Sequence, residues 1–176
     1  MLKNPLAILC TVLGLTGCAG VSPEVYRDQT PVLDIATYFN GPLTAWGYFA
    51  DRSGEVKRRF TVKMLGEWRG NEGILTENFF WSDGSTSQRI WRITRLDDHR
   101  YVGRADDVKG EADGVAYGNA LQWKYTLLLP VDGKTYEVQF DDWMYLMGDD
   151  VMLNKSEMRK FGFKLGEVVI AFKKGS

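Results

Sequence analysis

The chain has 176 residues, of which 26% are charged, 44% are hydrophobic and 13% are aromatic, and its formal net charge is −1. This length accommodates one domain with a sizeable core plus a short appendage, and the balanced charge gives no reason to expect a nucleic-acid partner. Both cysteines, Cys10 and Cys18, lie near the N-terminus, and His99 is the single histidine. A disulfide framework and a cysteine-based metal site are therefore excluded for the rest of the chain, and we expect no metal and no cofactor.

Residues 1–17 have the order of a bacterial signal peptide. Lys3 supplies a positive charge, and the apolar run PLAILCTVLGL that follows is shorter than the about 20 residues a membrane-spanning helix needs. The next residues, LTGC at 15–18, resemble the lipobox of bacterial lipoproteins. That resemblance implies cleavage before Cys18, a diacylglycerol on its thiol and acylation of the new amino terminus. The alternative is an ordinary secretion signal with an incidental cysteine.

The residue after the cysteine suggests where the protein resides. Ala19 at this position resembles the pattern associated with sorting to the outer membrane of Gram-negative bacteria. We therefore expect a lipid-anchored protein on the periplasmic face of the outer membrane. Its first partner is then the membrane itself, held through Cys18, because a single acyl chain gives only marginal residence and the lipoprotein anchor supplies more than one.

A tether and a helix are predicted before the main domain. Residues 18–30 show no apolar period and are expected to form a lipidated tether to a single domain over 31–176. Thr30 suits an N-cap and Pro31 suits the first helical position, so a short helix is expected over 31–39, ended by Asn40-Gly41-Pro42. Its apolar residues predict that the helix plugs or straps the following sheet; they are Val32, Ile35, Ala36 and Phe39.

From Leu43 onward the hydrophobic period changes to two, and turn signals such as DRSG, SDGSTS and PVDGK separate short alternating segments. The clearest segment is VKRRFTVKM at 56–64, and LQWKYTLLL at 121–129 alternates in the same way. About ten short strands joined by hairpin-length links favour an all-β, mainly antiparallel, lipocalin-like up-and-down β-barrel, which leaves no exposed sheet edge. A β-sandwich is the alternative.

Three long stretches resemble one family. They are GPLTAWGYFADRSGEVKRRFTVKMLGEW, LDDHRYVGRADDVKGEADGVAYGNALQWKY and DDWMYLMGDDVMLNKSEMRKFGFKLGEVVIAFKK. Together they are similar to a Gram-negative lipoprotein family, domain of unknown function 3833, over most of the mature chain. The family has no established activity to carry over, and the description of its members near fatty-acid modification genes implies a lipid-related role. A looser similarity to lipocalins rests on Trp46 in the first strand, although GPLTAW lacks their G-x-W signature.

Five residues form the predicted ligand site. Arg58, Glu77 and Arg92 share strand faces with apolar residues, and a charge inside a small barrel is costly unless it serves a ligand or another charge. An arginine fork suits a fatty-acid carboxylate or a phosphate group. Trp46 and Trp123 are expected to line an apolar cavity. The alternatives are a one-residue error in register, which returns the charges to solvent, and tryptophans that fill a solid core.

Other patterns are weaker as sites. Small residues alternate along GEADGVAYG at 110–118, which leaves room for a ligand or serves tight packing. Four acidic pairs lack calcium-binding spacing and are expected to be solvated turn residues; they are Asp97-Asp98, Asp106-Asp107, Asp141-Asp142 and Asp149-Asp150. His99 also lies in a predicted turn, and neither a nucleophile elbow nor a nucleotide-binding motif is present, so no catalytic residue is predicted.

The leading hypothesis is an outer-membrane lipoprotein whose barrel binds or transfers an apolar ligand, such as a fatty acyl chain or a phospholipid. The second is a non-enzymatic envelope assembly module with a solid core and a protein partner. An enzyme acting on lipids is the third, and it requires His99 or an acidic pair to lie inside a cavity.

Overall fold

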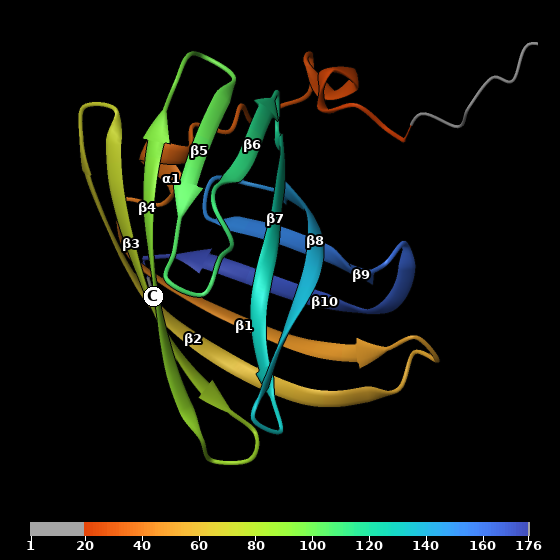
Figure 1. Ribbon diagram of the computed structural model, residues 1–176. Helices are drawn as coiled ribbons and strands as arrows, with labels where there is room; N and C mark the ends of the chain where they lie inside the picture. The colour runs from red at the N-terminus through yellow and green to blue at the C-terminus, as the bar shows by residue number, and fades with distance from the viewer. Residues whose placement is uncertain (1–19, 176) are drawn as a thin grey trace, which may run out of the picture.

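The computed structural model describes residues 20–175, so the predicted signal peptide and Cys18 lie outside the described residues. Ten antiparallel strands form a closed barrel in which each strand pairs with its neighbour in sequence and β1 pairs with β10 (Figure 1). The strands are β1 (Gly41–Asp51), β2 (Val56–Arg69), β3 (Glu72–Trp81), β4 (Thr86–Arg95), β5 (Arg100–Arg104), β6 (Ala112–Tyr117), β7 (Ala120–Val131), β8 (Lys134–Leu146), β9 (Val151–Lys160) and β10 (Phe163–Lys174). The predicted all-β meander barrel is confirmed, and the sandwich alternative is wrong.

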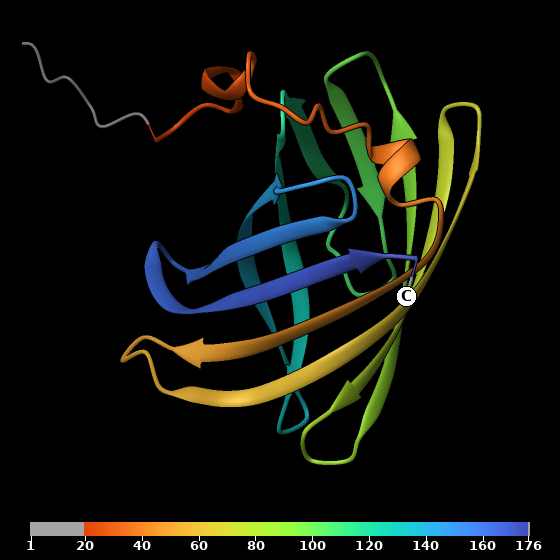
Figure 2. The ribbon, with the colours of Figure 1, turned by 180° about the vertical axis from the view of Figure 1, so that it is seen from behind.

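The two ends of the barrel differ. The turns β1–β2, β3–β4, β5–β6, β7–β8 and β9–β10 lie at one end because the strands alternate in direction. At the other end, where β2–β3, β4–β5 and β6–β7 turn, the chain leading into β1 crosses the opening and carries the helix α1 (Ile35–Tyr38), as Figures 1 and 2 show. We call these the open end and the closed end, and the halves of the barrel next to them the open half and the closed half.

The helix is shorter than the sequence predicted. It spans one turn rather than residues 31–39, and its N-cap is Asp34, whose carboxylate accepts a hydrogen bond of 2.6 Å from the backbone N–H of Thr37. The preceding residues are not helical because the N–H of Leu33 donates to the carbonyl oxygen of Gly118 in the barrel, at 2.8 Å. The expected plugging role holds, since Ile35 and Phe39 are buried.

The predicted tether is partly docked on the barrel. Within it, Pro23–Tyr26 form a 3-10 turn, η1. The ring of Tyr26 packs edge-on against Trp143 and Tyr145, with centroids 6.0 and 5.4 Å away, and its backbone lies so close to Gly118 that a Cβ there would be 1.8 Å from the Tyr26 carbonyl oxygen. The structure therefore differs from the prediction of a free tether over 18–30, and only residues 18–22 of that segment precede the docked turn.

Within residues 20–175, no helix is long and apolar enough to cross a bilayer.

Buried side chains form a large and a small cluster. The large one fills the closed half and includes the helix residues Ile35 and Phe39 together with Leu43, Trp91 and Trp123. The small one lies in the open half and consists of Leu127, Val138, Phe140 and Met158. The core is thus concentrated at the closed end, and the space between the clusters is where the site lies.

Candidate functional site

The barrel encloses a cavity of about 380 Å³. Ile35 and Phe39 form its floor at the closed end. Ser87 and Gln88, which line it next to the β3–β4 turn, are exposed, so the cavity reaches solvent at the open end. The volume lies within the range of about 300–1,000 Å³ typical of small-molecule sites. The barrel is therefore hollow, whereas the second hypothesis required a solid core.

One wall of the cavity is apolar. It is built by strands β10, β1 and β2, whose inward side chains alternate with outward ones. The predicted register of β2 is confirmed, because Phe60, Val62 and Met64 are buried and face the cavity. The remaining apolar lining of this wall comes from Phe49, Val168, Ile170 and Phe172. Such a wall suits a hydrocarbon ligand.

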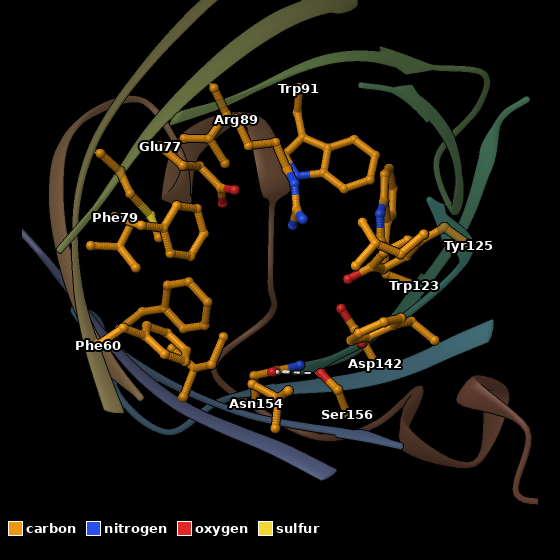
Figure 3. A pocket seen from close by; sticks show the side chains of 18 of the residues that line it. Phe60, Glu77, Phe79, Arg89, Trp91, Trp123, Tyr125, Asp142, Asn154 and Ser156 are labelled. Atoms are coloured by element: carbon orange, nitrogen blue, oxygen red, sulfur yellow. Dashed lines mark hydrogen bonds between the residues drawn. The ribbon is translucent and has the colours of Figure 1, made fainter. Parts of the chain in front are cut away.

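The opposite wall carries buried charges (Figure 3). Glu77 on β3 lies directly opposite Arg89 on β4 in the strand register and is only 8% exposed. Burial raises the pKa of Glu77 to about 7, against the opposing effect of the Arg89 cation, and the Asp107 and Asp142 carboxylates add to the rise. A carboxyl with this pKa changes its protonation state near neutral pH.

Arg89 is already held by a carboxylate. Its Nε donates to both Asp107 oxygens at 3.1 and 2.9 Å, and its Nη2 donates to Oδ2 at 2.7 Å. Burial alone lowers the pKa of Arg89, but Tyr125, Glu77 and Asp107 together raise it above the ordinary value, so the guanidinium stays charged. The Nε and Nη2 edge of the guanidinium is thus occupied by Asp107, which leaves its Nη1 donors for another acceptor.

Asp142 on β8 is the second buried carboxyl of the cavity. It is 7% exposed, and its Oδ1 is buried without a hydrogen-bond partner. Burial raises its pKa to about 7, although Ser156, Arg89 and Tyr125 lower it. Beside it, the Ser156 hydroxyl donates to Asn154 Oδ1 at 3.0 Å, as the dashed line in Figure 3 marks.

Two aromatic residues of β7 complete this wall. Tyr125 stacks on Phe140 with ring centroids 5.0 Å apart, and burial raises the pKa of its phenol well above the ordinary value, so it is neutral. Trp123 packs edge-on against Trp91 at 5.6 Å. Both rings face the cavity.

The run of small residues serves packing rather than a ligand. A Cβ at Gly103 or at Gly114 would each lie 2.4 Å from a ring atom of Trp123, so these glycines make room for the indole. The tight-packing reading of GEADGVAYG is the one that the structure supports.

The predicted site residues divide into two groups. Glu77 and Trp123 line the cavity. Arg58 lines it at the open end, where its guanidinium lies 4.0 Å above the Trp81 ring and Nη2 donates to Asp83 at 2.6 Å, while its Nε has no hydrogen-bond partner.

Trp46 and Arg92 lie on the outer surface, so the prediction that they line the cavity is wrong. Trp46 is 48% exposed because its neighbour Gly47 takes the inward position, where a Cβ would lie 2.5 Å from Phe60. On β4 the inward residues are Trp91 and Ile93, which turns Arg92 outward to Asp106 at 3.6 Å.

Sequence reasoning missed Arg89, Asp107 and Asp142. The two aspartates were assigned to solvated acidic pairs, yet they lie inside the cavity. A signal for Asp142 was present, because it alternates in phase with Val138, Phe140, Met144 and Leu146. By contrast, His99 lies outside the cavity lining, and its ring stacks on Tyr117 at 3.9 Å. Across residues 20–175, no three acidic, histidine or cysteine side chains are grouped to hold a metal ion.

Comparisons with known proteins locate the chain among proteins without assigned roles. The family model described as "Protein of unknown function (DUF3833)" matches residues 12–174. No curated protein matches. The barrel is similar to a crystal structure of a protein of unknown function from the DUF3598 family of Nostoc punctiforme, with a TM-score of 0.56 and 9% identity, covering 82% of this chain and 50% of that chain. At this identity the likeness shows the fold alone, and the chain spans half the length of the Nostoc protein.

Proposed function

Since the chain belongs to the DUF3833 family, whose description assigns no activity, we propose from its own cavity that it binds and transfers an apolar ligand. The ligand class is a fatty acyl chain, free or as part of a phospholipid, and the protein acts at the periplasmic face of the outer membrane. The observation that carries the proposal is the cavity of about 380 Å³, with its aromatic and aliphatic wall and its opening at one end.

Chain length is the expected determinant of affinity. Each methylene group buried against this wall contributes about 0.8 kcal/mol, which corresponds to roughly fourfold in affinity. The gain stops when the chain reaches the floor formed by Ile35 and Phe39. A series of alkyl ligands should therefore show affinity that rises steadily and then levels off at one length.

The membrane anchor belongs to the same proposal. Cys18 is the proposed lipid attachment site, and only residues 18–22 separate it from the docked turn η1. Five extended residues span at most roughly 17 Å, so the anchor would hold the barrel close to the bilayer. A Cys18→Ser variant is expected to lose palmitate labelling and to leave the membrane fraction, and an unchanged distribution would contradict this part.

The rim of the open end supports exchange of the ligand with a bilayer. The β9–β10 hairpin exposes Phe161 and Phe163, which are 85% and 76% accessible, between Lys160 and Lys164. Exposed aromatic rings with flanking lysines suit the interface of a membrane. In both ribbon views this hairpin lies on the same side of the barrel as the described start of the chain (Figures 1 and 2).

Lipid bound to the purified protein tests the proposal directly. The mature chain 18–176 carrying Cys18→Ser is purified from the periplasm and analysed by native mass spectrometry and lipid extraction, with about one acyl ligand per chain expected. Ile170→Trp, which fills the cavity, should lose the ligand, whereas Val169→Trp, on the opposite face of β10, should keep it. Both variants must show cooperative thermal unfolding. Absence of lipid from the parent protein would contradict the proposal.

A second function is favoured by one observation on the outer surface. Trp46 and Phe80, 48% and 50% exposed, flank Thr61 across β1, β2 and β3 and line a shallow groove there. Exposed apolar grooves of this kind suit a protein partner, as an envelope assembly module requires. A photo-crosslinker at position 46 would trap a specific protein in envelopes if this function holds, and it would trap only lipid or nothing if it does not.

A further inference from the structure

We infer that the polar end of the ligand is a hydrogen-bond donor, a hydroxyl or an amine, received by the carboxyl groups of Glu77 and Asp142, and that it is not a free carboxylate. This inference rests on the proposed function, because it names the polar end of the same acyl ligand.

The two carboxyl groups are built into the cavity from different strands. Glu77 projects from β3 and Asp142 from β8, and both point into the space that Figure 3 shows. Each is more than nine-tenths buried, and within residues 20–175 neither forms an ion pair. Asp142 Oδ1 has no hydrogen-bond partner. An unsatisfied buried acceptor destabilises the protein, and a donor on the ligand would remove this cost.

The arginines of the cavity lining are engaged elsewhere. Arg89 is held by Asp107 through three hydrogen bonds, and Arg58, at the open end, is held by Asp83 and Ser85. Asp107 neutralises the Arg89 cation but takes only its Nε hydrogen and one Nη2 hydrogen, so a ligand could reach only the Nη1 edge of this guanidinium. Each of these arginines is therefore already paired with an aspartate, whereas Glu77 and Asp142 form no ion pair among residues 20–175.

Electrostatics favour the same class of ligand. Charges that share a water-excluded space interact far more strongly than charges in water. A carboxylate beside ionised Glu77 and Asp142 is repelled, whereas an ammonium group is attracted to both and a hydroxyl group donates to either. The other titratable groups that face the pair are Arg89 and Asp107, which offset each other, Tyr125, which is neutral, and Asp141, which adds negative charge near Asp142.

Ligand affinity is expected to depend on pH, because the pKa values of both carboxyls lie near neutral pH. Both carboxyls have pKa values raised to about 7 by burial. At pH 8 they are mostly ionised and oppose an anionic ligand, and at pH 5.5 they are mostly protonated and oppose it less. An amine ligand should respond in the opposite direction, and an alcohol should respond little.

Three probes of equal length test the inference: dodecylamine, dodecanol and dodecanoic acid. The mature chain with Cys18→Ser is loaded with the neutral fluorophore N-phenyl-1-naphthylamine, and displacement by each probe is measured at pH 8 and pH 5.5. At pH 8, dodecylamine is expected to bind at least about tenfold more tightly than dodecanoic acid, which corresponds to one pKa unit of differential interaction. Dodecanoic acid should gain affinity at pH 5.5, and dodecanol should change less than about threefold.

Matched variants assign the effect to the two carboxyls. Glu77→Gln and Asp142→Asn should each lower dodecylamine affinity at pH 8 several-fold and reduce the pH dependence. Asp141→Asn, at the neighbouring carboxylate outside the cavity lining, should have a smaller effect, because Asp141 acts only through its charge near Asp142. Glutamine and asparagine preserve side-chain size, and unchanged dodecanol binding would show that the cavity is intact.

Other outcomes separate the inference from the proposed function. If dodecanoic acid binds most tightly at pH 8 and loses affinity in Arg58→Gln, the ligand is an anion held at the open end and the inference is overturned. Equal, pH-independent binding of all three probes would also overturn it, while leaving acyl-chain binding intact. If no probe displaces the fluorophore at either pH, the proposed function fails as well.

Discussion

The closed half and the open half of the barrel obey the same alternation of inward and outward side chains but use it differently. At the closed end the chain before β1 lies so near β2 that a Cβ at Gly66 would be 1.6 Å from the Phe39 carbonyl oxygen, and the apolar floor excludes water. Between this floor and the open end, inward positions hold Glu77, Arg89 and Asp142, whose burial costs free energy. Stability is thus concentrated at the floor, and the groups that oppose stability lie where a ligand can reach them.

Truncating a phenylalanine at each end gives the sharpest contrast. Phe39→Ala removes a buried ring that packs edge-on against Tyr38 and Phe172, so the free energy of unfolding should fall by about 3–5 kcal/mol. Phe161→Ala removes an exposed ring, so the change should stay within about 0.5 kcal/mol. Urea unfolding followed by far-UV circular dichroism measures both. Equal losses would show that the ends do not differ.

The pH dependence of stability tests the buried carboxyls. Their folded pKa values, about 7, lie above the ordinary values of 4.5 for Glu77 and 3.8 for Asp142. The native state therefore binds more protons than the unfolded state between these limits, and its stability falls as pH rises from about 4 to 8 and is then constant. Each group contributes on the order of 3 kcal/mol to this fall.

Neutral variants provide the control for that slope. Glu77→Gln and Asp142→Asn should each flatten the dependence. The free energy of unfolding should therefore fall less between pH 4.5 and pH 8 in each variant than in the parent. Asp141→Asn should change the slope much less, because Asp141 only adds to the rise in the pKa of Asp142. A parent protein whose free energy of unfolding does not fall between pH 4.5 and 8 would contradict the burial of the two carboxyls in the cavity.

Two arginines of β4 separate the inner and outer faces of one strand. Arg89→Met leaves Asp107 without its cation and Glu77 without a neutralising neighbour, and we expect a loss of about 2 kcal/mol, reduced from the fully buried case because Asp107 is partly exposed. Arg92→Met removes only a solvated contact to Asp106 and should cost less than about 0.5 kcal/mol. Thermal unfolding of both variants at pH 7 measures the difference, and comparable values would place Arg89 effectively in solvent.

The smallest effect on stability is expected at the rim. The double variant Phe161→Ser/Phe163→Ser should unfold like the parent but should exchange a fluorescent long-chain alcohol with anionic phospholipid vesicles several-fold more slowly. Leu65→Ser/Ile74→Ser is the control, because these residues are also exposed and apolar but lie toward the closed end. Equal slowing in both double variants would show that any exposed apolar residue serves, and unchanged exchange in the rim variant would remove the rim from the proposal.

The barrel was predictable because it follows from the local pattern of apolar and turn residues. For some strands, however, this pattern does not decide which face points inward. In β2 the apolar residues between Val56 and Met64 occupy one face only, so the inward side of this stretch is unambiguous. In β4 both faces carry apolar residues, Ile90 on one and Trp91 and Ile93 on the other, and the wrong face was chosen for Arg92. Trp46 misled for a related reason, because the inward position beside it is a glycine whose importance depends on Phe60 from another strand.

The sequence by itself determined the strand count, the meander order and the inward face of β2 and β7, because period-two alternation and turn residues act over a few neighbours. It also carries the prediction for Cys18, which needs no fold. Only the tertiary structure decided that Arg89 is neutralised by Asp107 and that Glu77 and Asp142 share one enclosed space. Desolvation and ion pairing depend on which strands close around a residue, and barrel closure joins β1 to β10 from opposite ends of the domain.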